Sequence, residues 1–248
     1  PGGRKLSAGG RADHFKGDYA KSRAGAIYLD SIGGRVLYCS FNNCSNEEYP
    51  YGGGAIVCCA ADNIVSDCYF ADFKSNRGSA IVWEAANGTL TNCNFKNCTE
   101  LGNGVVCWKG ENGTITDCRF SECFDYGGGT GHAGAIYMVG KNCIVANCNF
   151  ENCHSQNGAG TIYWGAINGI VDNCNFTNCF IRDNDGLIEG EGGAIYWAST
   201  LNGTISNCNF DNCYARAAGA ISWSGGGSTY WDGSSWIPVS GTLFNCNF

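Results

Sequence analysis

The sequence is poor in charge, in proline and in long apolar runs, and each shortage excludes a class of protein. Charged residues make up 15% of the 248 residues, and the formal net charge is −7. No basic cluster is present, which argues against a nucleic-acid partner. No apolar stretch approaches the roughly 18 residues that a membrane-spanning helix needs. With 38 glycines and only 3 prolines, the chain should turn often and regularly without being a disordered linker.

What the sequence has in abundance is a repeated octamer. TNCNFKNC, residues 91–98, returns as TDCRFSEC, ANCNFENC, DNCNFTNC and SNCNFDNC. Its first cysteine position occurs eight times, 25 to 38 residues apart, and alternates with a motif written GAIYL from Gly25 and GAIYW from Gly193. The chain closes on LFNCNF, in mid-pattern, and it shows no signal peptide. We therefore expect a mature product or a piece of a longer protein.

Each repeat predicts short strands rather than helices. Its apolar runs are three to five residues long, rich in β-branched and aromatic residues, and separated by Asn or Gly. Strands recurring about every 25 residues are typical of the coils of a parallel β-solenoid. We predict an all-β chain of about eight coils. Residues 1–24 would be a lead-in or partial coil, 25–248 the repeat domain, and 224–240 an insertion.

Strand alternation predicts which side chains fill the core. The isoleucine of GAI and the residue two positions later, often Trp, should point inward. The opposite assignment, with Ala and Tyr inward, is weaker because Ile is the most uniform position. The two octamer cysteines and the phenylalanine between them should also face the core. On the preceding strand we expect the inward residues to be Leu90, Ile115, Ile144, Val171 and Ile205.

Asparagine or aspartate marks the corners between strands. Both residues tolerate the left-handed backbone region and can hydrogen-bond nearby backbone. Because coils stack about 4.8 Å apart, an asparagine in one coil should bond its counterparts above and below, as amide ladders do. One corner precedes each octamer cysteine, and a third is made by NG pairs at Asn87, Asn112, Asn168 and Asn202.

Two stretches carry a resemblance to known repeats. GGAIYW from Gly192 and NGTISNCNFDNC from Asn202 resemble the repeats of adhesin-like surface proteins of methanogenic archaea. The pairing of GGAI with F-x-N is also similar to chlamydial polymorphic membrane proteins. The resemblance covers residues 25–248 and implies a right-handed, single-stranded parallel β-helix exposed at the cell surface. It departs at the second cysteine, where such repeats often carry Asn.

The eighteen cysteines admit three interpretations. Buried thiols would act as small core hydrophobes, which the replacement of one by Phe73 favours. Disulfides are the second, since Cα atoms of adjacent coils would lie about 4.8 Å apart. Zinc is disfavoured because it needs converging pairs. The core columns, or potential disulfide ladder, comprise Cys39, Cys44, Cys93, Cys98, Cys118, Cys123, Cys148, Cys153, Cys174, Cys179, Cys208 and Cys213.

A polysaccharide lyase or glycosidase is the enzymatic alternative. It would need clustered acids for Ca²⁺, or two carboxylates about 5 to 10 Å apart. Acids do not recur in the predicted strands. A weak Ca²⁺ candidate lies in RDNDGLIEGEGG, where a solvated loop is the simpler interpretation; its acids are Asp183, Asp185, Glu189 and Glu191. We therefore predict no catalytic residue, no resident metal and no cofactor.

The loops after the second cysteine should emerge at one edge of a solenoid, where recognition surfaces usually form. Aromatic side chains among glycine and serine suit sugar stacking or protein contact. The binding-surface candidates in these loops and in the insertion are Tyr49, Tyr51, Tyr126, Phe180, Tyr230, Trp231 and Trp236. Among six N-x-S/T sequons, Asn175 should point outward and is the best glycosylation candidate.

These features together predict a non-catalytic, extracellular adhesin or structural β-helix. Its partners would be other copies of itself, stacked end to end into filaments, or a cell-surface glycan or protein. The alternative is a β-helix that binds or degrades polysaccharide.

Overall fold

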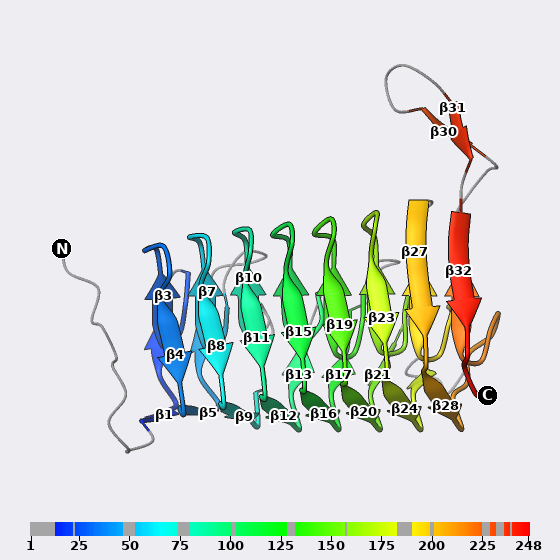
Figure 1. Ribbon diagram of the computed structural model, residues 1–248. Coiled ribbons are helices and arrows are strands. Elements are labelled where there is room, and N and C mark those ends of the chain that lie inside the picture. Colours follow the sequence, from blue (N-terminus) through cyan, green and yellow to red (C-terminus); the bar gives the residue numbers. More distant parts are fainter. Residues whose placement is uncertain are drawn as a thin grey trace.

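The computed structural model describes residues 13–21, 23–46, 53–73, 80–100, 103–127, 132–156, 158–182, 190–198, 201–224, 229–231, 236–238 and 240–248. These residues form strands and turns, with no helix among them. The strands stack side by side along a rod, with the chain advancing coil by coil from one end to the other (Figure 1). The predicted all-β parallel solenoid is confirmed.

Three parallel sheets of eight strands each enclose the core. The tryptophan sheet contains β3 (Ile27–Leu29), β7 (Ile56–Cys58), β10 (Ile81–Trp83), β14 (Val106–Trp108), β18 (Ile136–Met138), β22 (Ile162–Trp164), β26 (Ile195–Trp197) and β29 (Ile221–Trp223). The threonine sheet contains β4 (Arg35–Leu37), β8 (Ile64–Ser66), β11 (Thr89–Thr91), β15 (Thr114–Thr116), β19 (Ile144–Ala146), β23 (Ile170–Asp172), β27 (Leu201–Ser206) and β32 (Ser240–Phe244). The phenylalanine sheet contains β1 (His14–Lys16), β5 (Ser40–Asn42), β9 (Tyr69–Ala71), β12 (Asn94–Lys96), β16 (Arg119–Ser121), β20 (Asn149–Glu151), β24 (Asn175–Thr177) and β28 (Asn209–Asp211).

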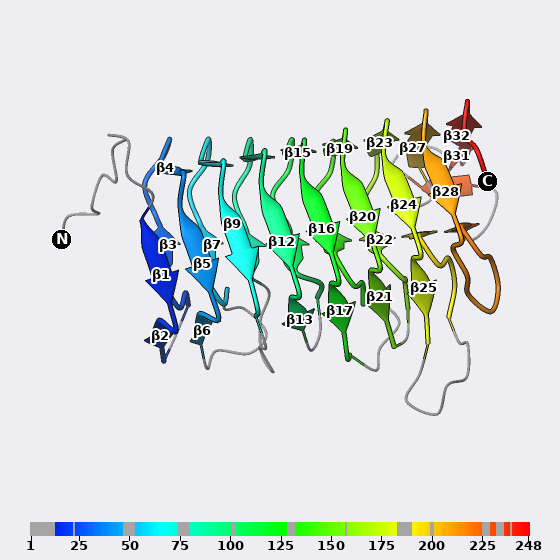
Figure 2. The ribbon, with the colours of Figure 1, turned by 90° about the horizontal axis from the view of Figure 1, so that it is seen from below.

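Each coil runs through the tryptophan, threonine and phenylalanine sheets in that order and then leaves the core. The departing segments form the edge sheet, whose strands are β13 (Thr99–Glu100), β17 (Phe124–Asp125), β21 (His154–Ser155) and β25 (Phe180–Ile181). Near the N-terminal end β2 (Tyr19–Ala20) pairs with β6 (Ser45–Asn46) in the same way. Viewed from below, these short strands form a row beside the phenylalanine sheet (Figure 2).

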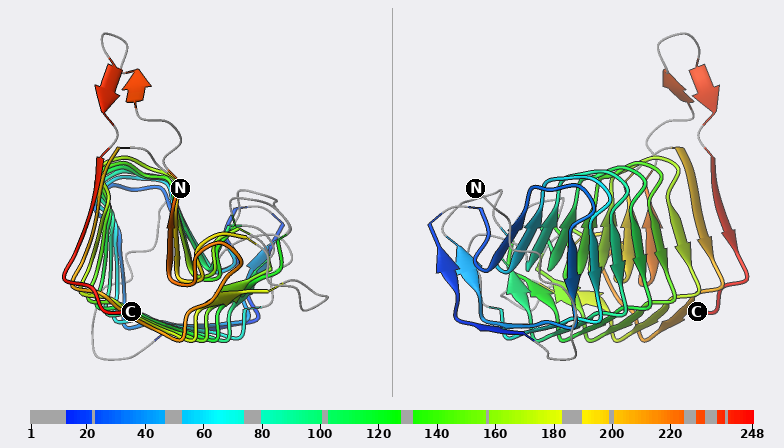
Figure 3. Two further views of the ribbon diagram at one scale, coloured as in Figure 1. Left: turned by 90° about the vertical axis from the view of Figure 1, so that its right-hand side faces the viewer. Right: turned by 60° about the vertical axis from the view of Figure 1, so that its left-hand side comes forward.

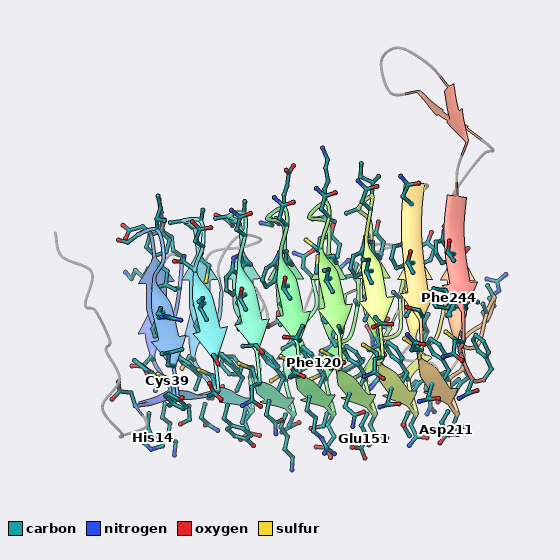
Figure 4. All side chains as sticks on the ribbon, viewed as in Figure 1. His14, Cys39, Phe120, Glu151, Asp211 and Phe244 are labelled. Carbon is teal, nitrogen blue, oxygen red and sulfur yellow. The ribbon has the colours of Figure 1, made fainter. Side chains whose placement is uncertain are left out.

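The core columns follow the predicted alternation, with one correction. The GAI isoleucines, the Trp column, the phenylalanines and both cysteine columns face inward and are mostly buried. On the threonine sheet Val145, not Ile144, is the inward residue, because Val145 pairs with Ile115 in the parallel register. Cys39 and Phe120 lie on the inner side of the ribbon, whereas His14, Glu151 and Asp211 lie on its outer face (Figure 4).

The phenylalanines form one continuous stack along the rod. Neighbouring ring centroids are 4.6 to 5.1 Å apart and the planes lie within 10° of parallel. This spacing is the repeat of the solenoid, and the near-parallel planes follow from identical residues in register. The rings are Phe15, Phe41, Phe70, Phe95, Phe120, Phe150, Phe176, Phe210 and Phe248.

Each NG corner requires glycine because a tryptophan side chain occupies the space in which a Cβ atom would lie. A Cβ built on Gly113 would lie 2.2 Å from Nε1 of Trp108, and Gly88 and Gly169 meet Trp83 and Trp164 in the same way. Two coils replace both residues, with Cys58 followed by Asn63 and Met138 followed by Cys143. The first coil has Leu29 in the tryptophan column and keeps Gly34, whose added Cβ would lie 2.9 Å from Oδ1 of Asn63.

The corner asparagines adopt left-handed backbone, with φ near +50°, and they form the predicted amide ladders. In the most regular ladder each Asn Nδ2 donates to Oδ1 of the preceding coil at 2.9 to 3.2 Å. Its members are Asp62, Asn87, Asn112, Asn142, Asn168 and Asn202.

Aspartates stand where the amide ladders begin. Asp62, Asp67 and Asp72 belong to one coil, and each accepts a hydrogen bond from the asparagine of the following coil. Because the corner asparagines donate toward the N-terminal end in these ladders, that end needs an acceptor and favours a negative charge. An aspartate, which accepts without donating, meets both requirements.

The octamer cysteines are free thiols, and from inside the core their sulfur atoms contact backbone carbonyl oxygens at the corners. Sγ of Cys118 lies 3.1 Å from the carbonyl oxygen of Thr116, two residues earlier, and the same contact recurs in the other coils. A thiol is small, apolar and a weak donor, so it fits a buried corner that exposes a carbonyl. All eighteen cysteines are free in this structure.

We expect Asn112→Asp to lower the free energy of unfolding by about 1 kcal/mol, because the donor to Asn87 is lost and two oxygens then face each other. Aspartate tolerates the same backbone at Asp62, so the change tests the ladder alone. Asn149→Asp, on the exposed face of the phenylalanine sheet, is the control and should change stability by less than about 0.5 kcal/mol. Urea unfolding measures both, and equal effects would contradict the ladder argument.

We expect Gly113→Ala to cost about 1 to 3 kcal/mol, since the added methyl overlaps the buried indole of Trp108. Combining it with Trp108→Met recreates the packing of the Met138 and Cys143 pair. The double variant should be more stable than the sum of the two single effects predicts. Additive single effects in thermal or urea unfolding would refute the complementarity.

Candidate functional site

The edge sheet positions the main candidate surface. Its strands follow the second cysteine of successive coils and pair in parallel, with Phe124 opposite His154 and His154 opposite Phe180. An isolated bridge adds Tyr214 beside Phe180. An end-on view shows these segments projecting to one side of the three-walled core (Figure 3). The loop edge, meaning these strands and the residues that adjoin them, is therefore common to successive coils.

The outer face of the edge sheet carries a second aromatic stack. Ring centroids are 4.1 Å apart for Phe124 and His154, 4.4 Å for His154 and Phe180, and 4.9 Å for Phe180 and Tyr214. The planes lie within 18° of parallel. Both faces of Phe180 are therefore covered by protein rings, and only its edge is available to a ligand. This differs from the predicted role of Phe180 in sugar stacking, which needs a free ring face.

Tyr126 lies differently from the stacked rings. Its ring meets Phe124 at 65°, with centroids 4.1 Å apart, and 48% of the residue is exposed. An edge-on contact leaves part of an aromatic face open to a partner. Among the sequence-predicted aromatic residues whose side chains are described, Tyr126 is thus the one best placed for stacking.

The inner face of the edge sheet holds buried polar groups. Glu100 and Asp125 pair across adjacent strands and are at most 1% exposed. The Asp125 carboxylate accepts the Gly127 N–H at 2.6 Å and lies 3.3 Å from Nδ1 of His132. These contacts fasten the loop that carries Tyr126. Because the two carboxylates are buried, they cannot reach a polysaccharide substrate.

Burial of His154 between two phenyl rings has an electrostatic consequence. Desolvation lowers the pKa of the His154 imidazole, and the nearby positive charge of Arg182 lowers it further, against a backbone contact at Asn152 that raises it. The ring is therefore held neutral at pH 7. A neutral imidazole stacks as a third aromatic ring in the row.

The remaining predicted site residues are scattered. Glu191 accepts a hydrogen bond from Ser222 Oγ at 2.9 Å, while Asp183, Asp185 and Glu189 lie outside the described residues, as do Tyr49 and Tyr51. Asn175 is exposed, and its Oδ1 accepts a bond from Asn209 Nδ2 at 2.8 Å. Within the described part of the chain, no group of three or more His, Cys, Asp or Glu side chains could hold a metal ion.

The insertion does not join the loop edge. Its strands β30 (Thr229–Trp231) and β31 (Trp236–Pro238) form an antiparallel hairpin with Trp231 opposite Trp236 and Tyr230 opposite Ile237. The hairpin projects from the corner between the tryptophan and threonine sheets, away from the edge sheet (Figure 3). The aromatic candidates within the described residues thus belong to two separate places.

Sequence reasoning missed His154 and Tyr214, although a signal was present. The residue after the second cysteine is Phe124, His154, Phe180 and Tyr214 in four successive repeats. A comparable outer row on the tryptophan sheet stacks Tyr137 on Tyr163, with centroids 5.1 Å apart. Aligning the repeats and comparing each position across coils would have revealed both rows.

Comparison with known proteins identifies the fold family. The family described as "Right handed beta helix region" matches residues 25–155, more than half of the chain. Comparison with curated proteins and with solved structures returns no significant match. No helix in the described residues is long and apolar enough to cross a membrane.

We expect His154→Phe to reduce the loss of stability on acidification. The folded pKa of His154 lies below its unfolded value of about 6.5. Its contribution is therefore complete above about pH 6.5 and falls as the pH drops toward the folded pKa, because the unfolded chain binds the proton more readily. Phenylalanine keeps the stack and does not titrate.

The measurement is urea unfolding at pH 7.5 and pH 5. The stability of the His154→Phe variant relative to wild type should rise at the lower pH. His14→Gln, at an exposed position of β1, serves as the control for replacing a histidine outside the edge sheet. An unchanged dependence in His154→Phe would contradict the assignment.

Proposed function

Because the chain belongs to the right-handed β-helix family, we propose that it is a non-catalytic, extracellular rod with a binding surface along its loop edge, similar in role to adhesin repeats. One observation carries the proposal. Successive coils deliver aromatic residues to a single edge, with exposed Tyr126 beside them.

The scaffold supports this role because the regular core and the variable segments occupy different parts of each repeat. The core columns repeat with little change, and most of the length variation lies between the second cysteine and the next GAI motif. In the sequence, those variable segments follow the edge-sheet strands. A constant rod that presents variable loops on one side can change its partner without changing its core.

The proposed partner is a cell-surface glycan or protein. Tyr126 offers an aromatic surface for a sugar ring or an apolar side chain. The insertion hairpin places Trp231 opposite Trp236 and provides a second, separate place for such a contact. Two contact places on one rod would strengthen binding to a repeating partner through effective concentration.

A non-catalytic role is favoured over a lyase or glycosidase by the position of the acids. Glu100 and Asp125 are brought together at the loop edge, but both are buried, and the Asp125 carboxylate holds the loop. A glycosidase instead needs two carboxylates that flank an accessible sugar.

The extracellular location is part of the proposal and rests on the resemblance to surface repeats. The free thiols suit an anoxic exterior, because oxidising surroundings favour disulfides. We also propose that copies stack head to tail into filaments, since a parallel coil presents an unpaired strand edge to the next. Electron micrographs that contain only single rods would remove this part of the proposal.

We expect Tyr126→Ala to weaken binding to the best ligand on a glycan or surface-protein array by about tenfold, corresponding to the loss of an aromatic contact of about 1 to 1.5 kcal/mol. Tyr69→Ala is the matched control, because Tyr69 is 41% exposed on the phenylalanine sheet. It should leave binding unchanged.

The wild-type protein should not cleave any polysaccharide in a panel of glycan substrates. Equal binding by both tyrosine variants would contradict the loop-edge assignment. Turnover of any glycan would contradict the non-catalytic proposal.

A further inference from the structure

One column of thiols runs the length of the solenoid. It contains the first octamer cysteine of each coil, and its members are Cys39, Cys68, Cys93, Cys118, Cys148, Cys174, Cys208 and Cys246. The first seven are at most 3% exposed. All eight are free thiols, so the column is a continuous row of soft donors inside an apolar core.

Neighbouring thiols in the column lie one above the other in adjacent coils, because the strands on both sides of the cysteine pair in register, for example Thr91 with Thr116 and Asn94 with Arg119. Eight thiols enclose seven gaps. The coil repeat sets their spacing, and the phenylalanine rings beside the column repeat at 4.6 to 5.1 Å.

We propose that this thiol column is a binding site for soft monovalent cations, Cu(I) or Ag(I), each held between the sulfurs of two adjacent coils. A metal–thiolate bond is about 2.3 Å long for zinc, so a linear sulfur–metal–sulfur unit of similar bonds spans roughly 4.6 Å. That span matches the coil repeat. Thiolate ligands select Cu(I) and its heavier relatives over hard cations.

Two-coordinate binding agrees with the rest of the structure. No group of three or more ligands in the described residues could hold a metal ion, which disfavours tetrahedral zinc. A linear monovalent ion needs two sulfurs only. The register places one pair of sulfurs at each step from coil to coil.

The exchange balances in charge. Each thiol gives up its proton and binds one cation, R–SH + M⁺ → R–S–M + H⁺, with no change in oxidation state. When each sulfur is shared between two cations and each cation between two sulfurs, the interior of the column stays neutral. A divalent ion neutralises two thiolates, so divalent ions could fill only alternate gaps without leaving net charge in the core, where an uncompensated charge is costly.

The exchange has a cost that limits it to soft metals. Each thiol now contacts a carbonyl oxygen, for example Cys148 Sγ with Ala146 O at 3.2 Å. Deprotonation removes these hydrogen bonds, which are weak because sulfur is a poor donor. Only a cation with a strong preference for sulfur compensates for their loss.

Silver titration of the full chain under anoxic conditions tests the proposal. Bound silver is counted by mass spectrometry of the metal after gel filtration, and released protons are counted by pH-stat. We expect several silver ions per folded chain, about one proton released per ion, and an X-ray absorption spectrum with two sulfurs per silver.

The variants localise the site. Cys118→Ala interrupts the column and should remove about two ions, whereas Cys107→Ala, a cysteine 1% exposed outside the column, should remove none from it. Cys246→Ala, in the last coil, should remove about one ion and serves if Cys118→Ala does not fold. Circular dichroism confirms the fold of each variant.

Three outcomes would overturn the proposal. They are silver uptake only after unfolding, equal losses in Cys107→Ala and Cys118→Ala, and coordination by three or more sulfurs. The loop-edge binding assay is independent of the column, so failure of one proposal leaves the other standing.

Discussion

The in-register parallel pairing of successive coils is the constraint on which the rest of the structure depends. Each strand is hydrogen-bonded to its equivalent in the next coil, so a residue at one position lies directly beside the same position 25 to 38 residues later. The backbone thereby converts a sequence repeat into columns of side chains. A column is stable only if its residue type can contact itself at the coil repeat.

The residue types that recur are those that satisfy this condition. Phenyl rings stack face to face. An asparagine amide donates a hydrogen bond to the preceding coil and accepts one from the following coil. Thiols are small and pack closely as weak donors. Charges do not stack in this way, which accounts for their scarcity in the repeats. The aspartates at the head of the ladders are consistent with the rule, because they stand where the ladder needs only an acceptor.

The same constraint divides the molecule into a scaffold that repeats from coil to coil and an edge that varies between coils. Each residue in a column packs against the equivalent residues of the two adjacent coils, so most column positions tolerate little change. The segments beyond the second cysteine leave this array, so their length and composition are freer. The aromatic row at Phe124, His154 and Phe180 shows that stacking extends even there, with the result that the rings offer edges, rather than faces, to a partner.

Much of the fold could be derived from the sequence because it depends on periodicity. The coil unit, the inward columns and the left-handed asparagine corners follow from recurrence and from single-residue backbone preferences. The inward residue of β19 could also have been derived, because Val145, like Leu90 and Ile115, lies three residues before the first octamer cysteine of its repeat, whereas Ile144 lies four before it. Tertiary structure alone decided that Trp108 covers Gly113, that the Asp125 carboxylate is buried under its own loop, and that both faces of Phe180 are occupied. These are contacts between side chains from different strands or coils, and their geometry exists only once the coils are stacked.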